Sequence, residues 1–320
     1  MIETYAFNER FEDARTMLDQ AMQEYAAKEP RFSALSPDLV RSGMAAFSHA
    51  YPNRTYNMGI AETSCIDFAA GMAVEGRLPV IYGMSAFLSM RSCEAIRTNL
   101  CYQNLHVVIL GNNTGLAQGP AGSTHYALED MAIMRLFPGM TLIAPADPAQ
   151  TVKAFYAAID TDGPVYIRMS NGRHEPSVYK QPYNYKIGKG IQVRAGSDVC
   201  IFACGIMVAH ALEAARQLET DGVHASVVDM HTIKPIDREL VIRMAQQTNC
   251  IVTVEDAFIC GGLGTAVSEI VAQEGLNCRV KPLGIPDVFP GFGSFGEQMD
   301  HYGYDVAGIQ SAALSLIRSK

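Results

Sequence analysis

Short apolar runs alternate with helical patterns through most of this chain, and this alternation restricts the fold more than any other feature. The run at 107–110 (Val-Val-Ile-Leu) has no polar alternation, which is typical of a strand buried on both faces. The pattern predicts further strands at 80–82, 141–143 and 165–167, and helices at about 92–104, 127–136 and 147–159. Repeated strand–helix units form mainly parallel sheets covered by helices, so we expect an α/β fold.

A second series of the same units follows a break in the pattern. Residues 171–196 carry proline, tyrosine, lysine and glycine with little periodicity, and we interpret them as a linker. Beyond it, strands are predicted at 199–203, 226–228 and 251–254, and helices at about 206–220, 237–247, 264–274 and 305–318. A chain of 320 residues is long enough for about two domains, which we place at 1–170 and 197–320.

Composition excludes several classes of protein. The net charge is −8 and no basic run occurs, which argues against a nucleic-acid partner. No apolar run approaches the roughly 18 residues that a membrane helix needs, and the N-terminus lacks the pattern of a signal peptide. The eight cysteines are scattered without a Cys-x-x-Cys pair, so we expect buried thiols of a cytoplasmic protein and no metal site.

The stretch at 57–62 (Asn-Met-Gly-Ile-Ala-Glu) is the strongest candidate for a site. It reads as the end of a strand, a glycine turn and the first residue of a helix at 62–74. Glu62 would then lie at the carboxyl edge of a parallel sheet, where open α/β sheets bind ligands. The alternative is a carboxylate that only stabilises the helix N-terminus, and the spacing by itself favours that simpler role.

Three further stretches carry candidate residues. The first helical pattern, at 10–28, has Arg15 on its apolar face, where a surface arginine is the common case. A long glycine-rich loop at 111–123 leads to His125, and loops of this length in compact domains are usually functional. The glycines at 261–264 open a helix and could bind phosphate, although close helix packing is the more frequent role.

The order and spacing of several motifs resemble one known family, over about 10–315. The motifs at 59–62 (Gly-Ile-Ala-Glu), 119–125 and 163–168 resemble the pyrimidine-binding domain of transketolases. Those at 229–237, 254–256 and 261–264 resemble the transketolase C-terminal domain. The Gly-Asp-Gly motif, by which the family's other half holds diphosphate and Mg²⁺, is absent from the sequence. The chain therefore resembles the small, C-terminal-half subunit of a split transketolase.

The resemblance implies a cofactor, a partner and a reaction. Thiamine diphosphate would be shared with an N-terminal-half subunit, which would hold the Mg²⁺, in an α₂β₂ assembly of the cytoplasm. The pair would transfer a two-carbon ketol, or related acyl-anion, unit between a small-molecule donor, such as a sugar phosphate, and an aldehyde. The alternatives are a β subunit of a 2-oxo acid dehydrogenase, a deoxyxylulose-phosphate-synthase-like chain, or a non-catalytic subunit that only pairs with another chain.

The resemblance also implies roles for individual residues. Glu62 would hydrogen-bond pyrimidine N1′ and favour the imino tautomer, whose 4′-nitrogen takes the proton from thiazolium C2. Phe87 matches the aromatic that stacks on the pyrimidine, and Met84 stands where many relatives have a second aromatic. His125 matches a histidine that faces the substrate.

Other matching positions concern the substrate. Arg15, Ser42 and Arg168 match positions that bind the phosphate tail of sugar phosphates. Asn113 and Ala121 stand where transketolases proper have a histidine and an aspartate, so we expect an unusual donor preference.

Overall fold

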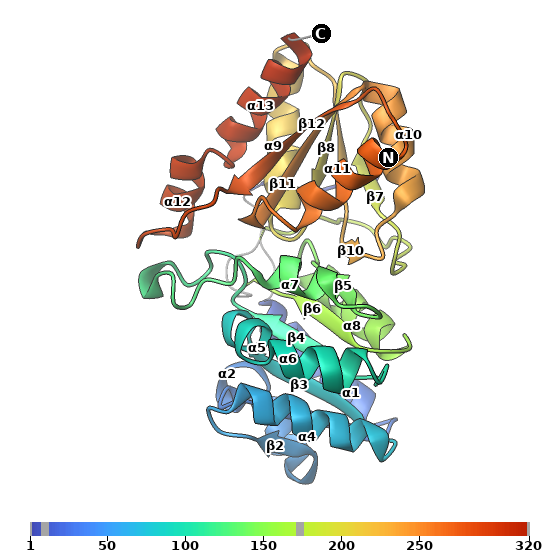
Figure 1. The fold of residues 1–320 in the computed structure, drawn as a ribbon, viewed down its shortest axis with the longest axis vertical. Helices are drawn as coiled ribbons and strands as arrows, with labels where there is room; N and C mark the ends of the chain where they lie inside the picture. The colour runs from blue at the N-terminus through green and yellow to red at the C-terminus, as the bar shows by residue number, and fades with distance from the viewer. Residues whose placement is uncertain (1, 8–12, 171–175, 319–320) are drawn as a thin grey trace.

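The chain folds into two α/β domains stacked along the long axis of the molecule (Figure 1). The structure is a computed structural model that describes residues 2–7, 13–170 and 176–318. The first domain is coloured blue to green and the C-terminal domain yellow to red (Figure 1). The predicted class, two α/β domains with mainly parallel sheets, is confirmed.

The first domain is built on a seven-stranded sheet with the order β10-β5-β6-β4-β3-β1-β2. Its strands are β1 (Phe32–Ser36), β2 (Thr55–Asn57), β3 (Leu78–Met84), β4 (Val108–Asn112), β5 (Thr141–Ile143), β6 (Val165–Arg168) and β10 (Thr232–Lys234). All neighbours are parallel except β10 and β5. β4 is central and buried at every residue, as its unbroken apolar pattern predicts. β10 was not predicted as a strand, and it crosses over from the C-terminal half of the chain.

Helices cover both faces of this sheet. They are α1 (Ala14–Ala26), α2 (Val40–Gly43), α3 (Ala45–Ala50), η1 (Pro52–Arg54), α4 (Glu62–Val74), α5 (Ser85–Arg91), α6 (Cys93–Ala95), η2 (Ile96–Cys101), η3 (Gly119–Ala121), α7 (Asp130–Leu136) and α8 (Pro148–Ile159). The helix predicted at 62–74 has those bounds in the structure. The stretch predicted as a helix at about 92–104 contains α6 and η2, and α5, which begins directly after β3, was not predicted. The prediction at 10–28 is met by α1, and residues 10–12 of it lie outside the described residues.

The C-terminal domain has a five-stranded sheet with the order β12-β11-β8-β9-β7. Its strands are β7 (Ile191–Arg194), β8 (Val199–Ala203), β9 (Ala225–Asp229), β11 (Cys250–Phe258) and β12 (Arg279–Ile285), and its helices are α9 (Met207–Thr220), α10 (Arg238–Thr248), α11 (Leu263–Gln273), α12 (Phe295–Tyr302) and α13 (Val306–Arg318). β7 falls within the predicted linker, β12 and α12 were not predicted, and the domain limits 1–170, 171–196 and 197–320 stay a prediction.

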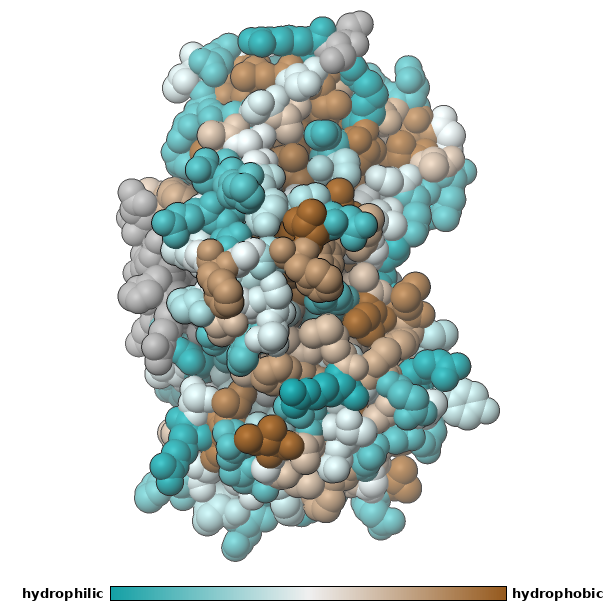
Figure 2. Space-filling model, turned by 60° about the vertical axis from the view of Figure 1, so that its left-hand side comes forward, coloured by the Kyte–Doolittle hydropathy of each residue, from teal (hydrophilic) through white to brown (hydrophobic). Residues whose placement is uncertain are grey.

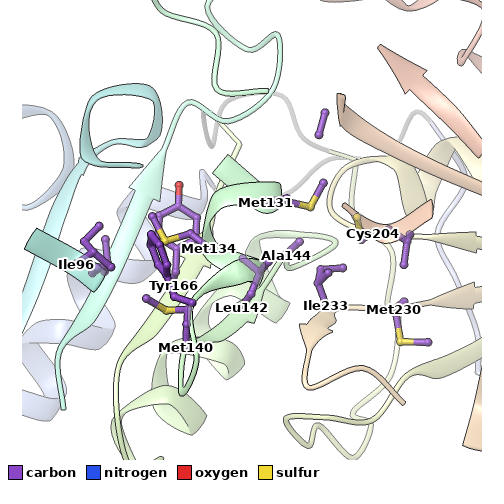
Figure 3. Packing of buried hydrophobic residues seen from close by; sticks show 14 of the residues in the cluster. Ile96, Met131, Met134, Met140, Leu142, Ala144, Tyr166, Cys204, Met230 and Ile233 are labelled. Atoms are coloured by element: carbon purple, nitrogen blue, oxygen red, sulfur yellow. The ribbon is translucent and has the colours of Figure 1, made fainter. Parts of the chain in front are cut away.

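An apolar cluster spans the junction of the two domains. Met131 and Met134 of α7 belong to the same buried cluster as Cys204, Met230 and Ile233 from the C-terminal half (Figure 3). Flexible methionine side chains fill irregular space well, which suits a junction between two separately built sheets. The relative position of the domains is therefore fixed by packing as well as by polar contacts.

Buried carboxyl groups gather near this junction and should make stability depend on pH. Burial raises the pKa of Asp229 to about 7, although Tyr179 and Gln150 both donate hydrogen bonds to it. Burial likewise raises the pKa of Glu255 to about 7 and that of Asp256 to about 6. A pKa that is higher in the folded state favours folding at low pH, and that contribution is lost as pH rises through the folded pKa.

We expect the free energy of unfolding to fall between about pH 4 and pH 7, where Asp229 ionises in the unfolded chain before it does so in the folded one. One such group changes it by at most about 1.4 kcal/mol per pH unit. Asp229→Asn keeps an acceptor oxygen for Gln150 and Tyr179, so it should flatten this slope in urea titrations across the range. Asp287→Asn, at an exposed position, is the control. If Asp229→Asn leaves the pH dependence of the unfolding free energy unchanged, the ionisation of Asp229 is not its cause.

Candidate active site

Glu62 lies where the sheet edge turns into a helix. Gly59 has φ +68°, a left-handed conformation that glycine adopts without strain, and α4 then begins at Glu62. The Glu62 side chain is only 7% exposed, and its Oε2 accepts a hydrogen bond from Arg91 Nη1 at 3.2 Å. No other hydrogen bond to this side chain occurs within the described residues. The carboxylate thus faces a neighbouring helix, α5, rather than capping its own.

Phe87 belongs to α5, and Met84 is the last residue of the preceding strand, β3. The guanidinium carbon of Arg91 is 4.5 Å from the centroid of the Phe87 ring. The His125 ring meets Phe87 nearly edge-on, with 5.3 Å between centroids and 68° between planes. Glu62, Phe87 and His125 come from three separate segments, and the structure brings them into one group, which we call the Glu62 cluster together with Arg91 and Met84.

His125 ends a loop that the C-terminal domain supports. Its Nδ1 is 2.9 Å from Thr124 Oγ1. Ser123 Oγ donates to the carbonyl of Pro290 at 2.5 Å, and the Tyr126 hydroxyl donates to the carbonyl of Gly291 at 2.8 Å. The position of His125 therefore depends on both domains, which sequence patterns in the first domain alone do not reveal.

Arg15 and Ser42 lie at a second place, an open cavity of about 310 Å³. Arg15 is paired with Asp13 at 3.3 Å, and Ser42 Oγ donates to the carbonyl of Leu39 at 3.0 Å. The cavity is also lined by Arg41, which sequence reasoning missed and which forms no ion pair within the described part of the chain. An anion could bind between the two arginines, at the cost of competing with Asp13.

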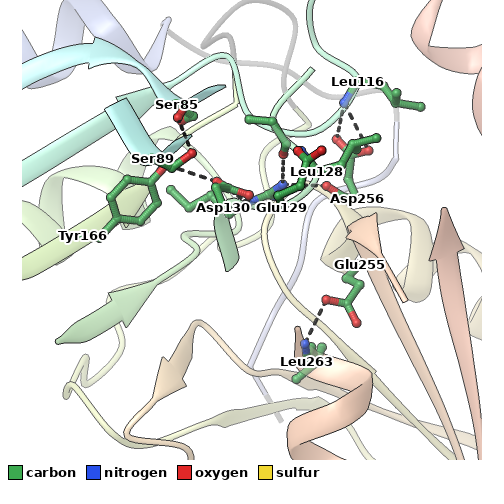
Figure 4. Close-up of polar contacts among 12 residues, drawn as sticks. Ser85, Ser89, Leu116, Leu128, Glu129, Asp130, Tyr166, Glu255, Asp256 and Leu263 are labelled. Carbon is green, nitrogen blue, oxygen red and sulfur yellow. Dashed lines mark hydrogen bonds and ion pairs between the residues drawn. The ribbon is translucent and has the colours of Figure 1, made fainter. Parts of the chain in front are cut away.

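Arg168 is in a different environment from the one expected of a phosphate ligand. Its side chain is 4% exposed, and its Nε donates to the carboxylate of Asp130 at 3.0 Å. Its Nη2 donates to the carbonyls of Ala127 and Asp256, at 3.0 and 2.6 Å. Asp130 and Asp256 lie on the two sides of the domain junction (Figure 4). In this geometry Arg168 joins the domains, and its role in substrate binding stays a prediction.

Asn113 and the glycines at 261–264 both lie where the protein's own groups contact their backbone. Asn113 is buried with φ +57°, and its backbone N–H faces the carbonyl of Ser170 at 3.4 Å. At the start of α11, the N–H groups of Leu263 and Gly264 donate to the buried carboxylate of Glu255, at 2.8 and 2.7 Å (Figure 4). A side chain of the protein thus takes the donors that a phosphate would need. The role of Asn113 in substrate binding stays a prediction.

The described residues lack two kinds of feature. They contain no group of three or more His, Cys, Asp or Glu side chains placed to hold a metal ion. None of their helices is both long and apolar enough to cross a membrane.

Large apolar side chains are exposed around the Glu62 cluster. Ile60 precedes Glu62 by two residues and Met90 adjoins Arg91, and both are exposed. Phe292, which is 80% exposed, lies against Gly122 in the loop that carries His125. Figure 2 shows apolar side chains close together near the middle of one face of the molecule. Exposed apolar groups of this kind are typical of a surface that another chain covers.

Comparison with known proteins gives one family for both domains. Family models match the transketolase pyrimidine-binding domain at residues 12–175 and the transketolase C-terminal domain at residues 188–309. A 6-deoxy-6-sulfo-D-fructose transketolase subunit, SqwH, of Clostridium sp. (strain MSTE9) is 38% identical over 93% of this chain and 92% of its own. One of the subunits of the apulose-4-phosphate transketolase of Phocaeicola vulgatus is 34% identical over 95% of this chain and 97% of its own.

Two further similarities concern the extent of the chain. A solved split-gene transketolase, described as an inactive beta4 tetramer, superposes with a TM-score of 0.87, at 35% identity over 97% of this chain and 99% of the other. The 1-deoxy-D-xylulose-5-phosphate synthase 1 of Geobacter sulfurreducens is 38% identical over 90% of this chain but only 45% of its own length. The fold and the matches define a subunit of a thiamine-diphosphate-dependent transferase. The chain belongs to the transketolase family and corresponds to the small subunit of a split enzyme.

Proposed function

We propose that this chain transfers a two-carbon ketol, or related acyl-anion, unit from a ketose or keto donor to an aldehyde, together with an N-terminal-half subunit. The observation that carries the proposal is the Glu62 cluster: a shielded carboxylate, an aromatic ring and a histidine meet at one edge of a pyrimidine-binding-type domain. The alternative of a non-catalytic pairing subunit gives no reason for these three side chains to converge.

The cluster fits the pyrimidine of thiamine diphosphate. A planar, nitrogen-bearing ring needs a carboxylate and an aromatic face within reach at the same time. The guanidinium of Arg91, itself planar and rich in N–H groups, reaches Glu62 Oε2 at 3.2 Å while lying 4.5 Å from the Phe87 centroid. Because one planar group contacts Glu62 and Phe87 at the same time, the spacing of these two side chains suits such a ring.

Four residues of the cluster then have a role. Bound thiamine diphosphate supplies a nucleophilic carbon that takes up and releases the transferred unit. Glu62 would hold a proton at pyrimidine N1′, Phe87 would support the ring, and Met84 would pack beside it. His125 would face the substrate and offer a ring nitrogen to it. Because the Gly-Asp-Gly motif is absent, the diphosphate and Mg²⁺ are assigned to the partner.

The substrate tail is assigned to the cavity around Arg15 and Ser42, with Arg41 as a further cation. Arg168 and Asn113 remain candidates for the same task. The two split relatives are named for 6-deoxy-6-sulfo-D-fructose and apulose 4-phosphate, so their names point to donors that differ from one another. Asn113 and Ala121 support an unusual donor here as well.

We expect the isolated chain to show no transfer activity and to bind thiamine diphosphate weakly. Mixing it with its N-terminal-half partner and Mg²⁺ should produce both activity and an α₂β₂ assembly, because closed two-fold assemblies are the common solution. Calorimetry and light scattering measure the two properties. Micromolar cofactor affinity of the isolated chain, or full activity at the mass of a one-to-one heterodimer, would contradict the proposal.

A deoxyxylulose-phosphate-synthase-like reaction is the second candidate, supported by the similarity to half of such an enzyme. The two reactions differ in their donor, since that synthase-like chemistry releases CO₂ from a 2-oxo acid. The reconstituted pair should transfer from a ketose without forming CO₂. Release of CO₂ from pyruvate at a higher kcat/KM than any ketose transfer would favour the second candidate.

A further inference from the structure

Arg91 is the one member of the Glu62 cluster that sequence reasoning did not find. It is the last residue of α5 and follows Phe87 by four positions, so both side chains lie on the same side of the helix. Its backbone is tied to α4, because Thr63 Oγ1 donates to the Arg91 carbonyl at 3.1 Å. Its side chain is 54% exposed, whereas that of its partner Glu62 is 7% exposed.

The contacts of Arg91 coincide with those that the proposed function assigns to the pyrimidine. The guanidinium donates an N–H to the Glu62 carboxylate and lies over the ring of Phe87. The pyrimidine needs the same carboxylate and the same ring. Two planar groups cannot occupy one aromatic face and one carboxylate oxygen together, so Arg91 has to move when the ring enters.

We propose that Arg91 is a cofactor-affinity determinant that competes with the pyrimidine of thiamine diphosphate for Glu62 and Phe87. The inference rests on the proposed function and adds a residue to it. The arginine stabilises the buried carboxylate with a counter-charge until the cofactor replaces it, and its half-exposed side chain can then turn into solvent. An ion pair and a cation–π contact at such a site are individually weak, so the competition is reversible and modest in size.

The direction in which cofactor Kd changes when Arg91 is replaced distinguishes a residue that competes with the pyrimidine from one that supports its binding. A residue that merely shapes the pocket would weaken cofactor binding when it is removed, whereas a competitor would strengthen it. We expect Arg91→Met to lower the Kd for thiamine diphosphate by about three- to tenfold, the size of one weak ion pair plus one cation–π contact. Because salt screens the ion pair, the difference from wild type should shrink at 1 M NaCl.

The test uses the chain reconstituted with its N-terminal-half partner, and isothermal calorimetry with thiamine diphosphate and Mg²⁺ gives Kd. Arg91→Lys keeps the charge without the planar group and should fall between wild type and Arg91→Met. Arg97→Met removes an exposed arginine six residues further on and should leave Kd unchanged. The thermal midpoint of each variant reports whether it is folded.

Unchanged or weaker binding by folded Arg91→Met overturns the inference, as does equal tightening by Arg97→Met. A double variant, Glu62→Gln with Arg91→Met, tests whether the effect passes through Glu62, since the gain from Arg91→Met should then shrink. Glu62→Gln alone separates this inference from the proposed function. If Glu62→Gln loses proton exchange at the cofactor while Arg91→Met leaves Kd unchanged, only the role of Arg91 is wrong.

Discussion

Glu62→Gln should lower kcat of the reconstituted enzyme by about 10²–10⁴-fold, the usual size of a general-base contribution. The substituted side chain has nearly the same shape, so the fold and much of the cofactor affinity should remain. The amide cannot carry the negative charge that favours a proton at pyrimidine N1′, and the 4′-nitrogen then stays a poor base. Steady-state kinetics at saturating cofactor, with the thermal midpoint measured in parallel, gives the result.

Glu75→Gln is the matched control, because Glu75 is exposed at the other end of the same helix, α4. It removes one carboxylate from the helix without touching the Glu62 cluster and should leave kcat unchanged. A Glu62→Gln enzyme that retains wild-type kcat, or one that loses activity only because it unfolds, would count against the role of Glu62.

Arg168→Met should destabilise the chain by about 3–5 kcal/mol, because it leaves the carboxylate of Asp130 buried without its cation. The substitution also removes the two hydrogen bonds to the carbonyls of Ala127 and Asp256, one of which crosses the domain junction. Urea unfolding measures the change. Arg238→Met, at an exposed pair with Glu274, should cost less than about 1 kcal/mol and is the control.

Arg168→Met also decides whether Arg168 binds the substrate phosphate or joins the two domains. A folded Arg168→Met with unchanged stability and a raised KM only for phosphorylated donors would restore the role predicted from sequence. A large loss of stability, with the KM of the surviving enzyme little changed, would make Arg168 a residue of the domain junction.

Local patterns predicted much of the fold because their causes are local. The bounds of α4 follow from the glycine turn at Gly59 and the spacing of apolar residues after Glu62. An aspartate followed by a proline is a typical helix start, and the Asp147 side chain does accept from Gln150 N at the start of α8. Such signals lie within a few residues of the element that they specify.

Other features depend on residues far apart in the chain. Arg168 meets Asp130 and Asp256, which are 38 and 88 positions away, so its burial could not be deduced from its own strand. β10 pairs with β5 across the domains. β12 lies at the edge of its sheet and contains an exposed lysine, Lys281, followed by Pro282. This pair interrupts the apolar pattern by which a strand is predicted.

The candidate site was predicted only in part, because contacts between separate segments have no local signal in the sequence. Glu62 and His125 were singled out by their places in the strand, loop and helix pattern, and Phe87 by the family resemblance. The structure brings the three together, although their roles stay predictions. Arg91 carries no motif, and its spacing of four residues from Phe87 was the only local signal of a contact.

Proton exchange at the reactive carbon of the cofactor tests the role of Glu62 most directly. The reconstituted wild-type enzyme, loaded with thiamine diphosphate and Mg²⁺, is transferred into D₂O and quenched with acid at set times, and NMR follows loss of the C2 proton. The account predicts that Glu62→Gln slows this exchange by about 10²–10⁴-fold while Glu75→Gln exchanges like wild type. Exchange at the wild-type rate in folded, cofactor-loaded Glu62→Gln would contradict it.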